Sequence, residues 1–134
     1  MYHVVVAVDE DEERARRQAE DVADLPHAAD EVRATLLHVF TDNPGGASAA
    51  QIASVKRAGE VLESAGVETT IEERSGEPAA VVLDFAQDED ADLICVGGRR
   101  RSPAGKAIFG STSQSVILQA DRPVLVTGGL EGVE

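Results

Sequence analysis

Apolar residues follow two alternating patterns along this chain. Short, nearly uninterrupted apolar runs, typical of strands buried on both faces of a sheet, occur at 4–8, 34–40, 93–96 and 124–126. A fifth segment, 67–73, alternates weakly and has the polar content of an exposed edge strand. Apolar residues recur at helical spacing within 11–25, 48–66, 78–86 and 111–120. Strands and helices that alternate in this way favour an α/β fold built on a doubly wound parallel sheet.

Residues with known capping preferences support the helix boundaries. Pro26 follows the end of the first helical segment. Ser48 and Gln51 have the spacing of a capping box, and Gly66 is placed to end that helix. Pro78 falls in the first turn of the next helix, where its missing N–H costs nothing.

The length of the chain sets its domain organisation. A chain of 134 residues can build one substantial core but not two, so we expect a single domain spanning 1–134. No apolar run approaches the length of a membrane span, and a strand pattern begins at the N-terminus in place of a signal peptide. We therefore expect a cytoplasmic protein that has no membrane partner. Cys95, the single cysteine, lies within an apolar run and is interpreted as a core residue, with a redox role as the alternative.

The charge balance of the chain is strongly acidic. Asp and Glu number 25 against 12 Lys and Arg, which gives a formal net charge of −13, and only Lys56 and Lys106 are lysines. Such an excess repels itself at low ionic strength, whereas molar salt shortens the Debye length to about 3 Å. The composition resembles that of proteins from extreme halophiles, so we expect folding to require salt. The same charge argues against DNA or RNA as a partner.

The stretch 97–111 has the pattern of a ligand-binding segment between a strand and a helix. Glycines allow backbone N–H groups to approach an anion, and the hydroxyls of Ser111, Thr112 and Ser113 lie at a predicted helix N-terminus, which favours phosphate. Its cations are Arg99, Arg100, Arg101 and Lys106. The alternative is a solvated turn whose arginines pair with the surrounding carboxylates.

Two polar residues follow or interrupt the predicted central strands. Asp9 ends the first strand, where a carboxylate can contact a ligand; it can also cap the next helix, and the two roles do not exclude each other. His38 lies within the second strand, and we interpret it as a residue with a structural hydrogen bond rather than as a catalytic base, because no nucleophile motif accompanies it.

These motifs together resemble the universal stress proteins of the nucleotide-binding kind. That family carries Gly-x-x-Gly, nine residues, then Gly-Ser or Gly-Thr directly after its fourth strand. Here Gly97 matches the first glycine and Gly110-Ser111 the closing pair, and Leu37-His38-Val39 is similar to the family's short strand signature. The second glycine of the motif, however, is Arg100 in this chain. The resemblance spans essentially the whole sequence.

The resemblance implies a Rossmann-like, five-stranded sheet in the order 3-2-1-4-5 that binds ATP or another adenine nucleotide, with or without Mg²⁺. In that order strands 1 and 4 are neighbours at the point where the order reverses, which is where open α/β sheets bind ligands. The implied nucleotide-binding residues, with Asp9 against the base, are Asp9, Val39, Gly97, Arg100, Gly110, Ser111 and Thr112. The side chain of Arg100 either obstructs the nucleotide or binds its phosphates, and the sequence leaves both open.

The chain lacks the motifs of a fast enzyme. Gly105-Lys106 is followed by Ala107 where a Walker loop needs Ser or Thr, and no base–nucleophile pair is evident. Three functions fit: a dimeric nucleotide-binding regulator that hydrolyses ATP slowly or not at all, a family member that binds no nucleotide and acts as an interaction module, and a nucleotide-using enzyme.

The apolar edge 124–126 predicts a homodimer through the last strand. Family and acidity together predict a halophilic archaeal source.

Overall fold

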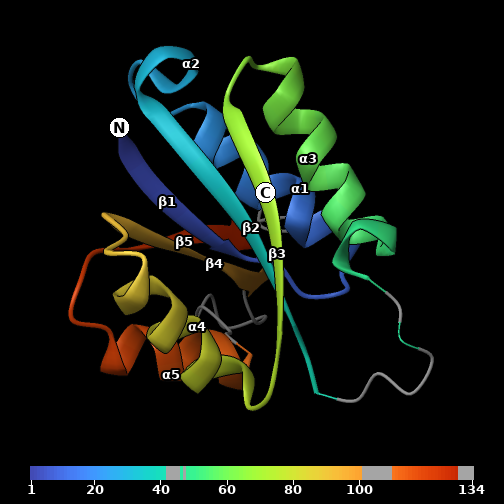
Figure 1. The fold of residues 1–134 in the computed structure, drawn as a ribbon, viewed down its shortest axis with the longest axis vertical. Coiled ribbons are helices and arrows are strands. Elements are labelled where there is room, and N and C mark those ends of the chain that lie inside the picture. Colours follow the sequence, from blue (N-terminus) through green and yellow to red (C-terminus); the bar gives the residue numbers. More distant parts are fainter. Residues whose placement is uncertain (42–45, 47, 101–109, 130–134) are drawn as a thin grey trace.

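One parallel sheet organises the molecule. In the computed structural model its five strands lie in the order β3-β2-β1-β4-β5, which confirms the predicted fold and strand order (Figure 1). The structure describes residues 1–41, 46, 48–100 and 110–129. The strands are β1 (Tyr2–Ala7), β2 (Val32–Phe40), β3 (Glu68–Ser75), β4 (Leu93–Arg100) and β5 (Val124–Gly129). The helices are α1 (Glu12–Ala23), α2 (Ala28–Glu31), the 3₁₀ turn η1 (Ala49–Gln51), α3 (Ala53–Ser64), α4 (Pro78–Asp88) and α5 (Ser111–Gln119).

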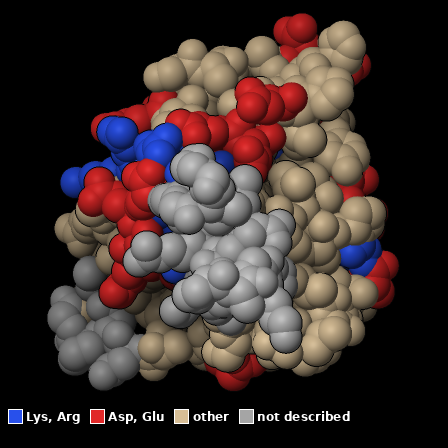
Figure 2. All heavy atoms as spheres, turned by 180° about the vertical axis from the view of Figure 1, so that it is seen from behind, with Lys and Arg blue, Asp and Glu red and all other residues tan. Residues whose placement is uncertain are grey.

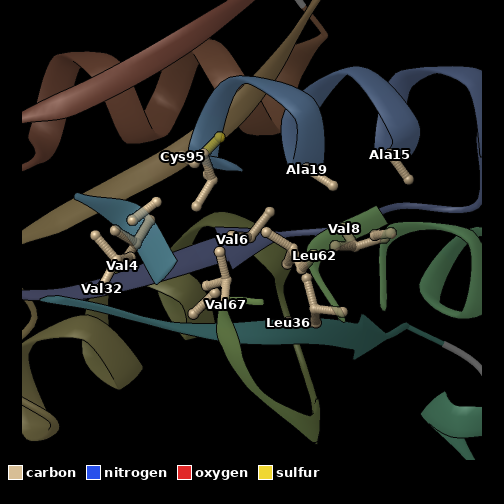
Figure 3. Packing of buried hydrophobic residues seen from close by; sticks show 14 of the residues in the cluster. Val4, Val6, Val8, Ala15, Ala19, Val32, Leu36, Leu62, Val67 and Cys95 are labelled. Carbon is tan, nitrogen blue, oxygen red and sulfur yellow. The ribbon is translucent and has the colours of Figure 1, made fainter. Parts of the chain in front are cut away.

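Strand β1 is buried on both faces because helices cover each side of the sheet. Helices α1 and α3 lie over one face, and α4 and α5 lie over the other (Figure 1). Val4 and Val6 point into the first layer, where Figure 3 shows them near Cys95 of β4, while Val5 points into the second. All three valines are 0% exposed. Burial of each valine therefore stabilises the fold by roughly 1.5–3 kcal/mol relative to an exposed position.

Cys95 is a core residue, as the sequence predicts. Its side chain is 0% exposed among the apolar residues between β4 and α1. Burial raises the pKa of its thiol to about 12, because the thiolate would lose its hydration there. The thiol is therefore un-ionised at neutral pH, which argues against the redox alternative.

The fourth strand is longer than predicted. The sequence places a loop directly after Val96, yet β4 continues to Arg100. The extension is stabilised by β5, which pairs Gly97 with Thr127 and Arg100 with Gly129, with a register shift between the two pairs. Ladder pairing with a neighbouring strand thus overrides the low strand propensity of Gly97 and Gly98.

The helical region 48–66 is also divided differently from the prediction. The expected capping box of Ser48 and Gln51 is present, but it caps the single turn of η1, and Ile52 is extended before α3 begins. The short helix α2, preceded by His27 in the left-handed region at φ 57°, has no counterpart among the predicted elements. Its four residues are too few to produce a periodic apolar pattern.

At the carboxyl ends of the neighbouring strands β1 and β4, the chain leaves the sheet towards opposite faces. Strand β1 leads into α1 on one face, and β4 leads towards α5 on the other, although β1 and β4 are hydrogen-bonded neighbours (Figure 1). The chain therefore diverges just beyond the last pair, Val6 and Cys95. This divergence is the topological switch point at which open α/β sheets place their ligand sites.

Candidate functional site

A cleft of about 500 Å³ lies at this switch point. It is bounded by the carboxyl ends of β1, β2 and β4, by the first turns of α1 and α4, and by the N-terminus of α5. Its described lining includes Asp9, Val39, Gly97, Gly110, Ser111 and Thr112. The fold therefore brings together these six predicted nucleotide-binding residues from opposite ends of the chain.

For Arg100, only the backbone is described. This residue is the last residue of β4 rather than part of a turn, and its main chain pairs with Gly129 of β5. Of the other predicted cations of this stretch, Arg99 also lies in β4, whereas Arg101 and Lys106 lie outside the described residues.

Side chains from three different elements satisfy the carbonyl groups at the end of β1. The amide nitrogen Nε2 of Gln18 in α1 donates to the Ala7 carbonyl at 2.8 Å. His38 Nδ1 lies 2.7 Å from the Val8 carbonyl, and since that oxygen can only accept, Nδ1 carries the proton. Ser54 Oγ in α3 donates to the Asp9 carbonyl at 2.5 Å.

These hydrogen bonds take the place of strand-to-strand hydrogen bonds at the point where β1 separates from β4. Gln18 also lies 3.4 Å from the Cys95 carbonyl, so it bridges the two strands as they separate. Gln18, His38 and Ser54 are all buried, and a buried carbonyl such as that of Val8 is costly without a partner. The structural hydrogen bond predicted for His38 is thereby confirmed. The sequence does not indicate these roles for Gln18 and Ser54, because their sequence patterns show only that they lie on helices.

Asp9 faces the cleft with both carboxylate oxygens engaged. Its Oδ1 accepts from the Asp11 backbone N–H at 2.9 Å, and its Oδ2 forms an ion pair with Arg14. Asp11, not Asp9, is the N-cap of α1, where it accepts from the Arg14 N–H at 2.9 Å. The alternative role of Asp9 as the cap of this helix is therefore ruled out, because Asp11 occupies the N-cap position and the helix begins at Glu12. The Asp9 side chain remains 55% exposed, which leaves it accessible to a ligand.

Arg14 closes the α1 side of the cleft. Its aliphatic stem lies over Gly97, so a Cβ atom at position 97 would overlap the Cγ and Cδ atoms of Arg14. This contact gives a physical reason for glycine at 97 that the sequence motif alone did not provide. The sequence does not single out Arg14, since nothing in the helical pattern distinguishes it from Arg16 and Arg17.

The opposite end of the cleft is formed by the first turn of α5. Gly110 occupies the N-cap position, where it has no side chain to cap the helix. The amides of a first helical turn have no partners within the helix, and the helix dipole adds partial positive charge. Ser111 is exposed and Thr112 is partly exposed, whereas Ser113 Oγ donates to the Gly97 carbonyl at 2.8 Å and ties α5 to β4.

Charge is unevenly distributed along the cleft. Asp9, Glu10 and Asp11 line one end together with Arg14, while hydroxyls and backbone amides line the other. Figure 2 shows acidic side chains next to basic ones on the face opposite that of Figure 1. Across the described residues, no group of three or more His, Cys, Asp or Glu side chains is arranged to hold a metal ion. Such a cleft suits a ligand that has a polar, uncharged part at one end and an anionic part at the other.

Comparison with known proteins identifies the family. A family model described as the universal stress protein family matches residues 1–128. This chain belongs to the universal stress protein family. A universal stress protein of Mycolicibacterium smegmatis is 32% identical over 110 residues, which cover 77% of this chain and 85% of that protein.

Solved universal stress protein structures share the fold over almost the whole chain. One from Archaeoglobus fulgidus has a TM-score of 0.75 at 32% identity and covers 95% of this chain and 98% of its own. Another structure from Archaeoglobus fulgidus, in complex with dAMP, has a TM-score of 0.71 at 26% identity with the same coverage. Within the described segments of this universal stress protein, no helix has the length and apolarity needed to cross a membrane.

Proposed function

We propose that this universal stress protein binds an adenine nucleotide, ATP in the first instance, in the cleft at the switch point. The base lies between Asp9 and Val39, and the phosphates lie on the amides and hydroxyls of 110–112. The observation that carries the proposal is the convergence of the predicted binding residues on one cleft at the carboxyl ends of the strands. The Archaeoglobus fulgidus structure with dAMP supports it at 26% identity.

The orientation of the nucleotide follows from the charges at the two ends. Phosphate is repelled by the carboxylates near Asp9 and attracted by the N-terminus of α5. Any Mg²⁺ would accompany the nucleotide through its phosphates, as is usual for this ion. Hydrolysis is slow or absent in this proposal, because the sequence carries no base–nucleophile motif.

Calorimetric titration with ATP, ADP and AMP, on protein prepared in high salt, tests the proposal. Arg100→Gly distinguishes the two roles of Arg100. If the side chain binds phosphate, the glycine variant binds ATP more weakly; if it obstructs the site, the variant gains affinity. Failure of both proteins to bind any of the three nucleotides would overturn the proposal and favour an interaction module without nucleotide.

We further propose that the protein forms a homodimer through β5. This strand is an edge of the sheet, and its residues Val124, Leu125 and Val126 are only partly buried although all are apolar. The opposite edge, β3, carries Glu68, Glu72 and other charged side chains that oppose edge pairing.

Light scattering at working salt is expected to give twice the chain mass. Leu125→Lys should abolish the dimer, and the control Ile71→Lys, on exposed β3, should not; a monomeric parent protein would refute the interface.

The acidic composition supports a proposal about environment. We place this protein in the cytoplasm of a halophilic archaeon, where concentrated salt screens the repulsion among its carboxylates. Thermal unfolding should then shift to higher temperature between low salt and molar potassium chloride. An unfolding midpoint that does not change with salt would contradict this assignment.

A further inference from the structure

One side chain, Arg14, contacts both halves of the cleft. Its guanidinium group forms an ion pair with Asp9, and its Nη2 lies 3.5 Å from Asp11 Oδ2. Its stem covers Gly97 of β4. The Arg14 side chain is only 19% exposed, so most of it is held between α1 and the end of the sheet. Arg14 is therefore part of the wall of the cleft rather than a solvated surface arginine.

Arg14 also completes the fixation of Asp9. The Asp9 backbone carbonyl is held by Ser54, and its carboxylate Oδ1 by the Asp11 N–H. The ion pair with Arg14 engages the remaining oxygen, Oδ2. A carboxylate bound through both oxygens cannot rotate freely, yet more than half of this side chain remains exposed to solvent, and Asp9 lines the cleft.

We propose that Arg14 is a positioning residue that sets the base specificity of the cleft by fixing the Asp9 carboxylate. This inference rests on the proposed function, in which Asp9 contacts the base. An ionised carboxylate can only accept hydrogen bonds. It therefore favours the exocyclic amine of adenine and disfavours hypoxanthine, which presents a carbonyl oxygen at that position. A fixed carboxylate enforces this discrimination, whereas one that can turn away does not.

The cleft remains open with Arg14 in place, which supports positioning rather than obstruction. Arg14 lines a cleft of about 500 Å³ without filling it. Its charge also offsets part of the negative charge of Asp9, Glu10 and Asp11 in the lining. Removing Arg14 would thus disfavour any phosphate-bearing ligand through charge alone. A test must separate this charge effect from the fixation of Asp9.

AMP and IMP provide that separation, because both carry the same phosphate and differ only in the base. The measured quantity is the ratio of their dissociation constants, from calorimetry in high salt. In Arg14→Ala we expect AMP binding to weaken by about tenfold, the size expected for one charge-assisted hydrogen bond, and the preference for AMP over IMP to fall towards unity. Arg14→Lys, which retains a cation able to pair with Asp9, should restore part of that preference.

Arg16→Ala is the matched control. Arg16 lies on the same helix and pairs with Glu13 and Glu20, neither of which lines the cleft. This variant removes the same charge from α1 and should keep the AMP/IMP ratio of the parent protein. Thermal unfolding of each variant confirms that it is folded.

The outcomes distinguish this inference from the proposed function. If the parent protein binds no adenine nucleotide, the proposed function fails and this inference with it. If the parent prefers AMP to IMP and Arg14→Ala keeps the same preference, only the role of Arg14 is overturned. A loss of preference in Arg16→Ala equal to that in Arg14→Ala would also overturn it, because net charge would then explain the effect.

Discussion

The two ends of the cleft are built in different ways. At the Asp9 end, backbone and carboxylate groups are held by buried or half-buried side chains from α1, β2 and α3. At the α5 end, the predicted ligand groups are the hydroxyls of Ser111 and Thr112 and the amides of a helix turn, which Ser113 ties to β4. Residues at the first end thus have structural roles as well as the proposed binding role. Substitutions there should reduce stability, whereas substitutions at the α5 end should reduce binding alone.

The largest effect is expected for His38→Leu at the Asp9 end. Leucine fills much of the space but leaves the Val8 carbonyl without its donor, and it removes the edge-to-face contact with Phe40, whose ring centroid lies 4.7 Å away. A buried unsatisfied carbonyl costs about 1–3 kcal/mol, and the lost aromatic contact adds about 0.5–1.5 kcal/mol. Chemical denaturation should show a lower free energy of unfolding by about 2–4 kcal/mol. A loss below about 0.5 kcal/mol would show that His38 is not needed to hold β1.

Gly97→Ala tests whether the stem of Arg14 is packed as tightly as the structure indicates. The added methyl group overlaps Arg14, and overpacking typically costs about 1–3 kcal/mol. In an Arg14→Ala background the same substitution should cost clearly less, because the overlapping atoms are absent. The measurement is a double-mutant cycle on the free energy of unfolding. Additive effects would mean that Arg14 moves away from Gly97 at little cost.

Ser54→Ala removes a single bond at the Asp9 end. The Asp9 carbonyl loses the hydroxyl donor from α3, although it lies close enough to the surface to gain water. We expect a loss of about 1 kcal/mol in the free energy of unfolding and a smaller loss of nucleotide affinity. An unchanged unfolding curve would place Ser54 outside the support of this end.

Ser111→Ala makes the smallest change in stability and sharpens the contrast between the ends. Ser111 is exposed in the first turn of α5, so the free energy of unfolding should change by less than about 0.5 kcal/mol. Affinity for ATP should nevertheless fall by about tenfold or more if the hydroxyl donates to phosphate. Calorimetry and denaturation of the same protein sample give both values. Loss of stability without loss of binding would reverse the assignment of the two ends.

Local patterns were sufficient to predict most of this fold. The continuous apolar run at 4–8, which consists of valines apart from Ala7, predicts a strand buried on both faces, and Val4 and Val5 do point into opposite layers. Pro78 in a first turn predicts the start of α4 within one residue. The candidate site was predicted through motif spacing: Gly97 and Gly110-Ser111 identify the two sides of one cleft. These features succeed because each is determined by residues close in sequence or by a spacing that a motif records.

Other features were decided only by tertiary structure. Strand β4 extends past Gly97 because β5 provides a pairing partner, which the propensity of the glycines cannot indicate. Gln18 and Ser54 contribute to the site because the end of β1 passes beneath them, although each has the sequence pattern of an ordinary helix residue. Arg14 differs from Arg16 only in the direction of its side chain and in what lies there. Sequence periodicity specifies which face of a helix is buried, but contacts between distant segments, set by packing, specify which polar side chains on that face meet the ligand site.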